Sequence, residues 1–552
     1  MYKNFIDILP IANKKHLIKA FLFFLLIAIC GYLSIMTSFS AYKDDHCRYL
    51  SNYPVGIYAG RSAALLLEIL LFFSTMAYDV APFSTILSCA FLACTATICQ
   101  SIFKNVSNVD DWTLKNDRWT LLCFTPMAVN PYLVENMIFR FDNPFMTLAM
   151  LCAVLSAYLA SIKKYSDDQY KNISTNDLPS DDGKWRQWLP TQIILLLLSL
   201  LLYQAALSAY CVICAYALLA NLARNQPLSQ AISEMRHWFY SLLCAVLAYA
   251  PLIIMTTIFD STRLLGTIPR NVSEIANNIA QNVALYFHGL FVNWSCNAVG
   301  IIFALIFIIF SISFAIDVLK QTQRRAIAIL RIVMILIALC IFCISPLGVD
   351  TPLNLSWHTT CREIRPRTLY AFGILISAVL YKNYLFIGKR AAAQKIYRIF
   401  LSCFCLWNIG FVNSVGNLMH AQRILQDNVF YDLSKDIFKI KAKYGNLRTL
   451  FIDGNVRTPA MKNFSRLYPL CNQIMPECWD MALYNILGLH TYGMNMSNSM
   501  IGTRKQIPPN RIMLKSRLWY NIYSIDDVII YVQLKGSNHK EDTLDWTIML
   551  KI

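Results

Sequence analysis

The chain has 552 residues, of which 57% are hydrophobic and only 15% charged, and its formal net charge is +17. A soluble domain is usually about half apolar and about a quarter charged, so a soluble globular protein is excluded. Apolar runs of about eighteen or more continuous residues recur, which indicates a polytopic helical membrane protein and excludes a closed β-barrel. The basic residues cluster at the ends of these runs, so the charge does not indicate nucleic-acid binding.

The first apolar run, residues 18–38, is followed by two adjacent aspartates, Asp44 and Asp45. Three lysines flank the start of the run, and basic residues favour the cytoplasmic side. We therefore expect a cytoplasmic N-terminus and an extracytoplasmic first loop, residues 41–60. A carboxylate near a low-dielectric boundary tends towards a raised pKa, which suits a general base that takes a proton from a sugar hydroxyl. The alternative is that the two acids only mark a solvated loop.

Two arginines, Arg48 and Arg61, lie in and just after this loop. Arginine is the natural partner of a phosphate at a lipid boundary, although side chains that reach towards lipid headgroups are the alternative. His46 and Cys47 are metal-ligand residue types, but contiguous residues have poor geometry for one tetrahedral ion. We therefore expect that the protein needs no cofactor, although the sequence leaves a divalent cation open.

The apolar run 119–138 is expected to be a re-entrant or broken helix. It contains two prolines and a carboxylate, which are poor choices for a lipid-facing helix. Counting it as a full crossing would also give an odd number of crossings before the basic residues at 163–164, where an even number is required. We predict that it returns to the outer face.

The segment NPYLVENMIFRFDNPFM, residues 130–146, supplies candidate substrate-lining residues. These are Glu135, Arg140 and Asp142. Its Asn-Pro pairs free backbone groups that need a cavity or a partner. The alternative is a kinked structural helix whose polar groups pair internally.

The following apolar runs complete about eleven crossings. Runs 192–203 and 207–222 form a tight pair, with Tyr203 and Gln204 at its outer tip. Runs 238–258 and 297–317 enclose an outside loop of about forty residues.

Runs 329–346 and 368–384 enclose a second outside loop, residues 347–367. Arg365 and Arg367 lie at the end of this loop, against the usual preference of basic residues for the cytoplasm. Phosphate binding explains them, and binding of anionic lipid is the alternative. After the last run, 397–417, the tail is extracytoplasmic. Residues 1–419 then form a transmembrane domain, and residues 420–552, with both strand-like and helix-like spacing, form a small α+β domain.

Four segments, in the same order, resemble one known family. DDHCRYL…GRSAALLLE resembles the opening loop of serotype-converting O-antigen glucosyltransferases of the Gtr type, which are associated with phages and prophages. NPYLVENMIFRFDNPFMTLAM, LSLLLYQAALSAYCV and IRPRTLYAFG resemble three later elements of that family. The resemblance covers most of the chain up to about residue 385. The sequence differs from the family pattern at Ser62, where proline is usual, and at His46 and Cys47, which are not typical of the family.

The resemblance implies a GT-C-like hexosyltransferase of the bacterial inner membrane. Such an enzyme takes a glucosyl group from undecaprenyl phosphate on the periplasmic face and attaches it to O-antigen repeats of lipopolysaccharide. A flippase and a cytoplasmic polyprenyl-phosphate glucosyltransferase supply the donor. By the same resemblance, either Asp44 or Asp45 is the base.

The arginines then have an expected role. Arg140, Arg365 and Arg367 are expected to stabilise the departing phosphate, and Tyr203 and Gln204 to line the pocket.

Two other classes of function stay open on the sequence alone. One is a transporter or flippase for a lipid-linked sugar, which would often show two matching halves with broken helices. No such symmetry is visible in the sequence. The other is a membrane-anchored subunit of polysaccharide assembly without activity of its own.

Overall fold

The computed structural model describes residues 14–38, 61–72, 81–107, 118–170, 182–224, 228–257, 269, 271–294, 298–321, 325–353, 364–388, 390–445, 449–453, 456–474, 511–525 and 529–535. These residues fall into two compact units. One contains most of the described residues up to Asn413, and the other contains those from Ser414 onward together with Thr37 and Ser38. The domain boundary predicted at 419/420 stays a prediction.

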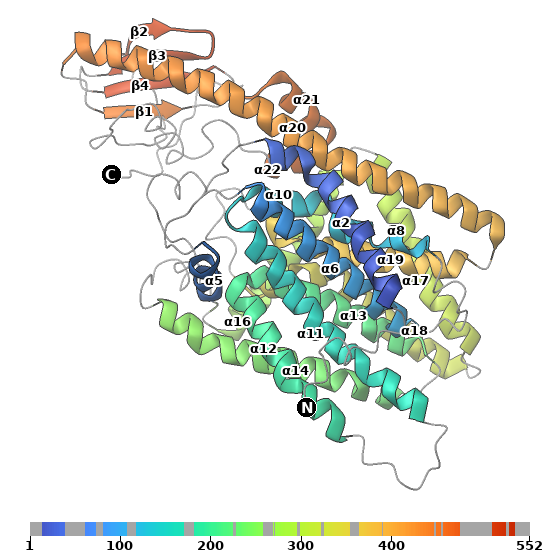
Figure 1. Ribbon diagram of the computed structural model, residues 1–552. Helices are drawn as coiled ribbons and strands as arrows, with labels where there is room; N and C mark the ends of the chain where they lie inside the picture. The colour runs from blue at the N-terminus through green and yellow to red at the C-terminus, as the bar shows by residue number, and fades with distance from the viewer. Residues whose placement is uncertain are drawn as a thin grey trace. The chain divides into compact units, whose positions relative to one another are not determined.

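In the part of the first unit that the structure describes, all the regular elements are helices (Figure 1). Its longer helices are α2 (Lys14–Thr37), α5 (Ser62–Phe72), α6 (Phe83–Val106), α11 (Asn143–Tyr170), α12 (Asp182–Leu202), α13 (Leu207–Leu222), α14 (Leu228–Thr257), α16 (Val272–Trp294), α17 (Ala298–Gln321), α18 (Arg325–Ile344), α19 (Phe372–Ile387) and the first part of α20 (Ala391–Lys443). Three 3-10 turns connect some of them, η2 (Gln204–Ala206), η3 (Ser345–Asp350) and η5 (Pro366–Thr368).

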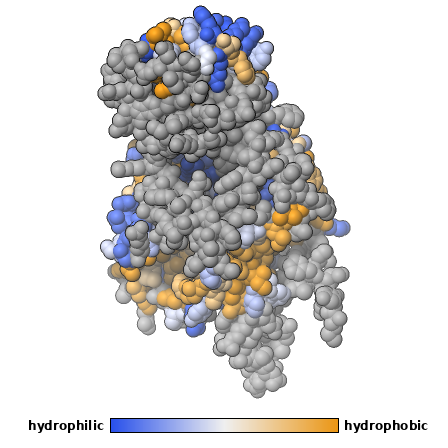
Figure 2. Space-filling view, turned by 90° about the vertical axis from the view of Figure 1, so that its left-hand side faces the viewer, coloured by the Kyte–Doolittle hydropathy of each residue, from blue (hydrophilic) through white to orange (hydrophobic). Residues whose placement is uncertain are grey.

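Seven stretches of the described residues are long and apolar enough to cross a membrane. They are Lys15–Thr37, Phe83–Val106, Asn143–Ser161, Gln204–Leu222, Val299–Lys320, Ile327–Gly348 and Ala391–Lys443. Large hydrophobic side chains are exposed along α14, α17 and α18, and Figure 2 shows hydrophobic surface of this kind on one face. The predicted class, a mainly α polytopic membrane protein, is confirmed. The number of crossings stays a prediction.

Helix α11 packs against α6, α12 and α13 (Figure 1). The buried amide of Asn143 fixes its first turn. Asn143 Nδ2 donates to Thr85 Oγ1 at 3.2 Å and to the Met137 carbonyl at 3.1 Å, while its Oδ1 accepts from Ser88 Oγ at 3.0 Å. A buried amide that finds all these partners specifies one arrangement of the elements around it. Asn143 therefore sets the position of Asp142, which directly precedes it.

The run 119–138 is broken into four short helical pieces, as its prolines favour. These are α8 (Thr120–Cys123), α9 (Thr125–Ala128), η1 (Pro131–Leu133) and α10 (Val134–Ile138). Asn130 caps η1, since its Oδ1 accepts from Tyr132 N at 2.9 Å and from Leu133 N at 3.1 Å. Gly373 of α19 packs so closely that a Cβ there would overlap the Pro126 carbonyl oxygen. The return of this segment to the outer face stays a prediction.

Helix α16 lies within the segment between residues 258 and 297, for which the sequence analysis expects an outside loop and names no helix. It is not one of the seven candidate spans among the described residues, so the outside position of this segment stays a prediction. Asn and Gln residues lower the mean hydropathy of this segment, although its apolar residues keep a helical spacing. Its buried face holds the backbone that follows α18. Asn282 Nδ2 lies 2.8–3.1 Å from the carbonyl oxygens of Asp350, Thr351 and Leu353. Asn278 Nδ2 donates to the Pro352 carbonyl at 3.2 Å.

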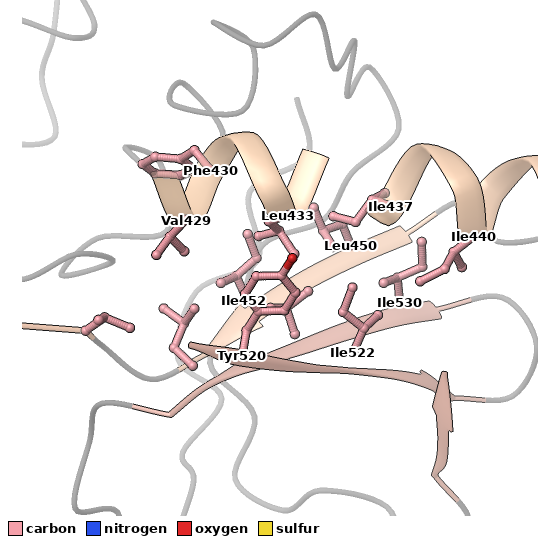
Figure 3. Packing of buried hydrophobic residues seen from close by; sticks show 13 residues of the cluster. Val429, Phe430, Leu433, Ile437, Ile440, Leu450, Ile452, Tyr520, Ile522 and Ile530 are labelled. Atoms are coloured by element: carbon pink, nitrogen blue, oxygen red, sulfur yellow. The ribbon is translucent and has the colours of Figure 1, made fainter. Parts of the chain in front are cut away.

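The C-terminal unit combines the later part of α20 with a four-stranded sheet in the order β1-β4-β3-β2. Its elements are β1 (Thr449–Asp453), α21 (Pro459–Leu467), α22 (Leu470–Ile474), β2 (Ile512–Ser516), β3 (Tyr520–Ile525) and β4 (Ile529–Leu534). Strand β1 is parallel to β4, and the other pairs are antiparallel. Residues of α20 spaced three or four apart, including Val429, Leu433 and Ile437, pack on the sheet (Figure 3).

A buried carboxylate ties α20 to β3 within this unit. Asp436 Oδ2 accepts from Arg517 Nε at 2.8 Å and from the Tyr520 hydroxyl at 3.0 Å, and its Oδ1 accepts from Arg517 Nη2 at 3.0 Å. Paired hydrogen bonds from one guanidinium to one carboxylate have a fixed geometry. This contact therefore sets the register of the helix on the sheet.

Candidate active site

The backbone of Arg367 is held by side chains from two distant parts of the helical unit. Glu135 Oε2 accepts from Arg367 N at 3.1 Å, while Asn136 Nδ2 donates to Arg367 O at 3.2 Å. The Tyr203 hydroxyl donates to the same carbonyl at 3.1 Å. The broken run, the tip between α12 and α13, and the loop before α19 therefore meet at one place. The structure brings together Glu135, Tyr203 and Arg367, three residues that the sequence singles out.

Arg61 joins this place from the start of α5. Its Nη1 lies 3.8 Å from Asp142 Oδ2, and its Cζ lies 4.7 Å from the centroid of the Tyr203 ring. A guanidinium over an aromatic face gains from the ring quadrupole. The Arg61 Nε is buried and has no hydrogen-bond partner among the described residues. One donor of this guanidinium is thus left for another group.

Asp350 completes the cluster, and sequence reasoning missed it. The residue is 9% exposed, and its Oδ2 has no hydrogen-bond partner in the part of the chain that the structure describes. Burial raises the pKa of its carboxyl to about 6, against the opposing effects of the Thr368 side chain and the Arg367 guanidinium. The signal that singles out Asp44, an acid just past an apolar run, applies equally to Asp350.

The turn that carries Asp350 is possible only because residue 348 is glycine. Gly348 has φ +49, a conformation that L side chains rarely adopt. A Cβ at this position would also lie 2.8 Å from Ser208 Cβ and 2.9 Å from Ser208 Cα. The turn is thus pressed against α13 on one side, while Asn282 holds its carbonyls on the other. Asp350 is fixed by packing on both sides.

Tyr203 lies at the centre of the electrostatics of the cluster. The charges of Arg367, Arg61, Asp350 and Glu135 all act on its hydroxyl. Its ring also contacts the ring of Tyr370 edge to face, with centroids 5.6 Å apart.

The other predicted residues lie near these groups in sequence or in space. Gln204 Nε2 donates to the Tyr249 hydroxyl at 2.7 Å, and Tyr249 is a contact that the sequence did not suggest. Arg140 is buried in the short connection between α10 and α11, two residues before Asp142. Arg365 directly precedes η5, where its carbonyl accepts from Thr368 N at 3.1 Å.

Three predicted residues, Asp44, Asp45 and Arg48, lie outside the described residues. Their roles stay predictions. The described residues contain no group of three or more His, Cys, Asp or Glu side chains that could hold a metal ion.

The charges of the cluster fit an anion. Four arginines and three carboxyl groups lie in it or within two residues of a member, so the formal balance is positive. Guanidinium groups bind phosphate with paired hydrogen bonds, and they do so more strongly where water is excluded. Buried acids next to them offer acceptors for hydroxyl groups. The arrangement is suited to a ligand that carries both a phosphate and hydroxyls.

Comparison with known proteins gives a consistent result. A curated protein of Salmonella phage P22, described as "Uncharacterized 55.3 kDa protein in gtrB 5'region", is 24% identical over 227 residues. That match covers 41% of this chain and 41% of the phage protein, so it spans less than half the length of either. No solved structure matches the chain.

A family model described as "Glucosyl transferase GtrII" matches residues 33–378. The matched stretch is more than half of the chain, and every member of the buried cluster lies inside it, from Arg61 to Arg367. The chain therefore belongs to the glucosyl transferase GtrII family.

Proposed function

We propose that this chain transfers a glucosyl group from undecaprenyl phosphate to O-antigen repeat units of lipopolysaccharide, on the periplasmic face of the inner membrane, and so converts the serotype. The family supports glucosyl transfer, and the spanning helices support a donor that is delivered through lipid. The observation that carries the proposal is the buried cluster of arginines and carboxyl groups around Tyr203. Ionisable groups buried in a membrane protein are costly, so they are not expected in a bundle that serves only as an anchor or a scaffold.

The reaction needs a base, an electrophilic carbon and a place for the leaving charge. Asp44 or Asp45 takes the proton of the acceptor hydroxyl, and that oxygen attacks the anomeric carbon. The bond from this carbon to the phosphate oxygen breaks, and its electron pair leaves with the polyprenyl phosphate. The phosphodiester becomes a phosphomonoester, so the phosphate gains one negative charge in the step.

The arginines stabilise the charge that develops on this phosphate. The Arg61 guanidinium lies over the Tyr203 ring, and the Arg367 carbonyl accepts from the Tyr203 hydroxyl. Arg140 and Arg365 lie within two residues of cluster members in the sequence. Such preorganised groups act most strongly on charge that appears only in the transition state. Because the leaving group is already a phosphate ester held by arginines, the proposal uses no metal. Tyr203 and Gln204 line the pocket.

The remaining parts of the proposal rest on the expected topology and on what the family resemblance implies. The N-terminus is cytoplasmic and the C-terminal domain periplasmic. A flippase and a cytoplasmic polyprenyl-phosphate glucosyltransferase deliver the donor. The C-terminal domain helps to hold the polysaccharide acceptor.

The test compares the O-antigen of cells with and without this chain, by sugar analysis and linkage NMR. We expect one additional glucosyl residue per repeat unit when the chain is present. Arg367→Gln and Arg61→Gln should abolish that addition, whereas Arg390→Gln, which removes an exposed charge, should not. An unchanged O-antigen, together with movement of lipid-linked glucose across vesicles that contain only this chain, would instead identify a transporter.

A further inference from the structure

Four buried polar atoms around Tyr203 have no hydrogen-bond partner among the described residues. They are Asp350 Oδ2, Asn136 Oδ1, the Tyr370 hydroxyl and Arg61 Nε. Asn136 and Tyr370 are 0% and 1% exposed, so bulk water does not satisfy them. A buried polar group without a partner is costly, and several at one place call for an explanation. A bound ligand that supplies the missing partners is the simplest one.

These four atoms belong to one site. Arg61 lies over the Tyr203 ring, the Tyr370 ring contacts the same ring, and the Asp350 charge acts on the Tyr203 hydroxyl. Asn136 is joined to Tyr203 through the Arg367 carbonyl, to which both side chains donate. The orphaned atoms therefore surround a single aromatic residue, although they come from four separate parts of the chain.

The chemistry of the four atoms divides the site into two parts. The Asn136 amide has a fixed orientation, because its Nδ2 donates to Arg367 O and to Met146 Sδ, so its Oδ1 is left as an acceptor. An ionised Asp350 Oδ2 is likewise an acceptor. Arg61 Nε is only a donor, and the Tyr370 hydroxyl is both. A phosphate ester offers acceptors and fits Arg61, whereas sugar hydroxyls offer donors and fit Asp350 and Asn136.

We propose that Asp350, Asn136 and Tyr370 form the subsite that binds the hydroxyls of the transferred hexosyl group, while Arg61 binds the phosphate to which that group is attached. This inference rests on the proposed function and adds to it the residues that recognise the sugar. Asp350 is placed to accept from a sugar hydroxyl because packing on both sides fixes its turn. The division predicts that the two ends of the donor are recognised by separable groups.

The experiment measures the affinity of the purified full-length chain for two lipids, undecaprenyl phosphate-glucose and sugar-free undecaprenyl phosphate. Asp350→Asn should weaken binding of the glucosylated lipid about 10-fold or more, because it removes a charge-assisted hydrogen bond. Tyr370→Phe, which removes only a hydroxyl, should weaken it about fivefold. Both variants should bind the sugar-free lipid within about twofold of the unchanged protein. That retained binding also shows that the variants are folded. Arg61→Gln should weaken binding of both lipids.

Two matched variants control for the loss of a buried phenol and of a carboxylate elsewhere. Tyr32→Phe removes a buried phenol whose hydroxyl lies near Cys89, and Asp317→Asn removes a carboxylate that pairs with Lys382. Both should bind the two lipids as the unchanged protein does.

The result that overturns the inference is an equal effect of Asp350→Asn and Tyr370→Phe on both lipids, or no effect on either. If the protein without substitutions still transfers glucose, that result overturns only the assignment of the subsite, and the proposed function stands. If the unchanged protein binds neither lipid and transfers no sugar, the proposed function itself fails.

Discussion

Asp350→Asn should make the protein more stable at neutral pH, although it alters a residue of the site. The carboxyl of Asp350 has a pKa raised from 3.8 to about 6 by burial, so the folded protein holds this proton more tightly than the unfolded chain does. The stabilisation from the protonated form is fully present below about pH 4 and is lost as the pH rises through about 6. Asparagine resembles the protonated acid but does not titrate.

The magnitude follows from the pKa difference. At about 1.4 kcal/mol per pKa unit, a rise from 3.8 to about 6 corresponds to about 3 kcal/mol between the two protonation states. We therefore expect the variant and the unchanged protein to be equally stable near pH 4. Above pH 7 the free energy of unfolding of the variant should be greater by up to about 3 kcal/mol. Glu135 and Asp142 are present in both proteins, so the difference between them isolates Asp350.

The assay is thermal unfolding of both proteins in the same detergent between pH 4 and pH 8, followed by intrinsic fluorescence. Asp317→Asn is the matched contrast, because it removes a carboxylate that is paired with Lys382 and should lower stability near neutral pH. A lower stability of Asp350→Asn at pH 7, or a difference that does not vary with pH, would refute the reasoning. It would mean that the charged carboxylate has partners that offset its burial.

Asp44→Asn and Asp45→Asn, made separately, should show which aspartate is the base. One of the two substitutions should slow glucosyl transfer about 10²–10⁴-fold while donor binding persists. Full activity of both variants would exclude this role for either aspartate. Gly348→Ala should lower the free energy of unfolding by about 1–3 kcal/mol in thermal melts, because the new Cβ would overlap Ser208 and because alanine rarely adopts a positive φ. An unchanged melting temperature would show that the turn can move. Asp436→Ala should cost the C-terminal unit about 1–3 kcal/mol and speed hydrogen exchange in β3, whereas Asp436→Asn should lose less.

The sequence predicts the spanning helices well because continuous apolar runs admit few other structures. The tip at Tyr203 and Gln204 is found for the same reason, since α12 ends at Leu202 and α13 begins at Leu207. Helix α16 is missed because its Asn and Gln residues lower the mean hydropathy, although Asn278 and Asn282 hydrogen-bond to backbone carbonyls such as that of Asp350. Those partners are more than sixty residues away in sequence, so no local pattern reveals them.

The candidate site shows the same limit. Glu135, Arg61 and Arg367 are recognised as chemically suitable residues, but their meeting point depends on how the broken run packs. The sequence gives no sign that Glu135 binds the backbone of Arg367, which makes it a positioning residue for that loop. Nothing in the local sequence shows that Asn136 Oδ1 and the Tyr370 hydroxyl are buried without a hydrogen-bond partner among the described residues.

The three hydrogen bonds at residue 367 all involve peptide atoms, which has a consequence for how this protein can vary. Any residue except proline supplies both an amide hydrogen and a carbonyl oxygen, so these three hydrogen bonds do not depend on which side chain stands there. The charge that the loop presents can change while its path stays the same. Single substitutions at residue 367 can therefore alter the charge beside Tyr203 while the three contacts that hold the backbone persist.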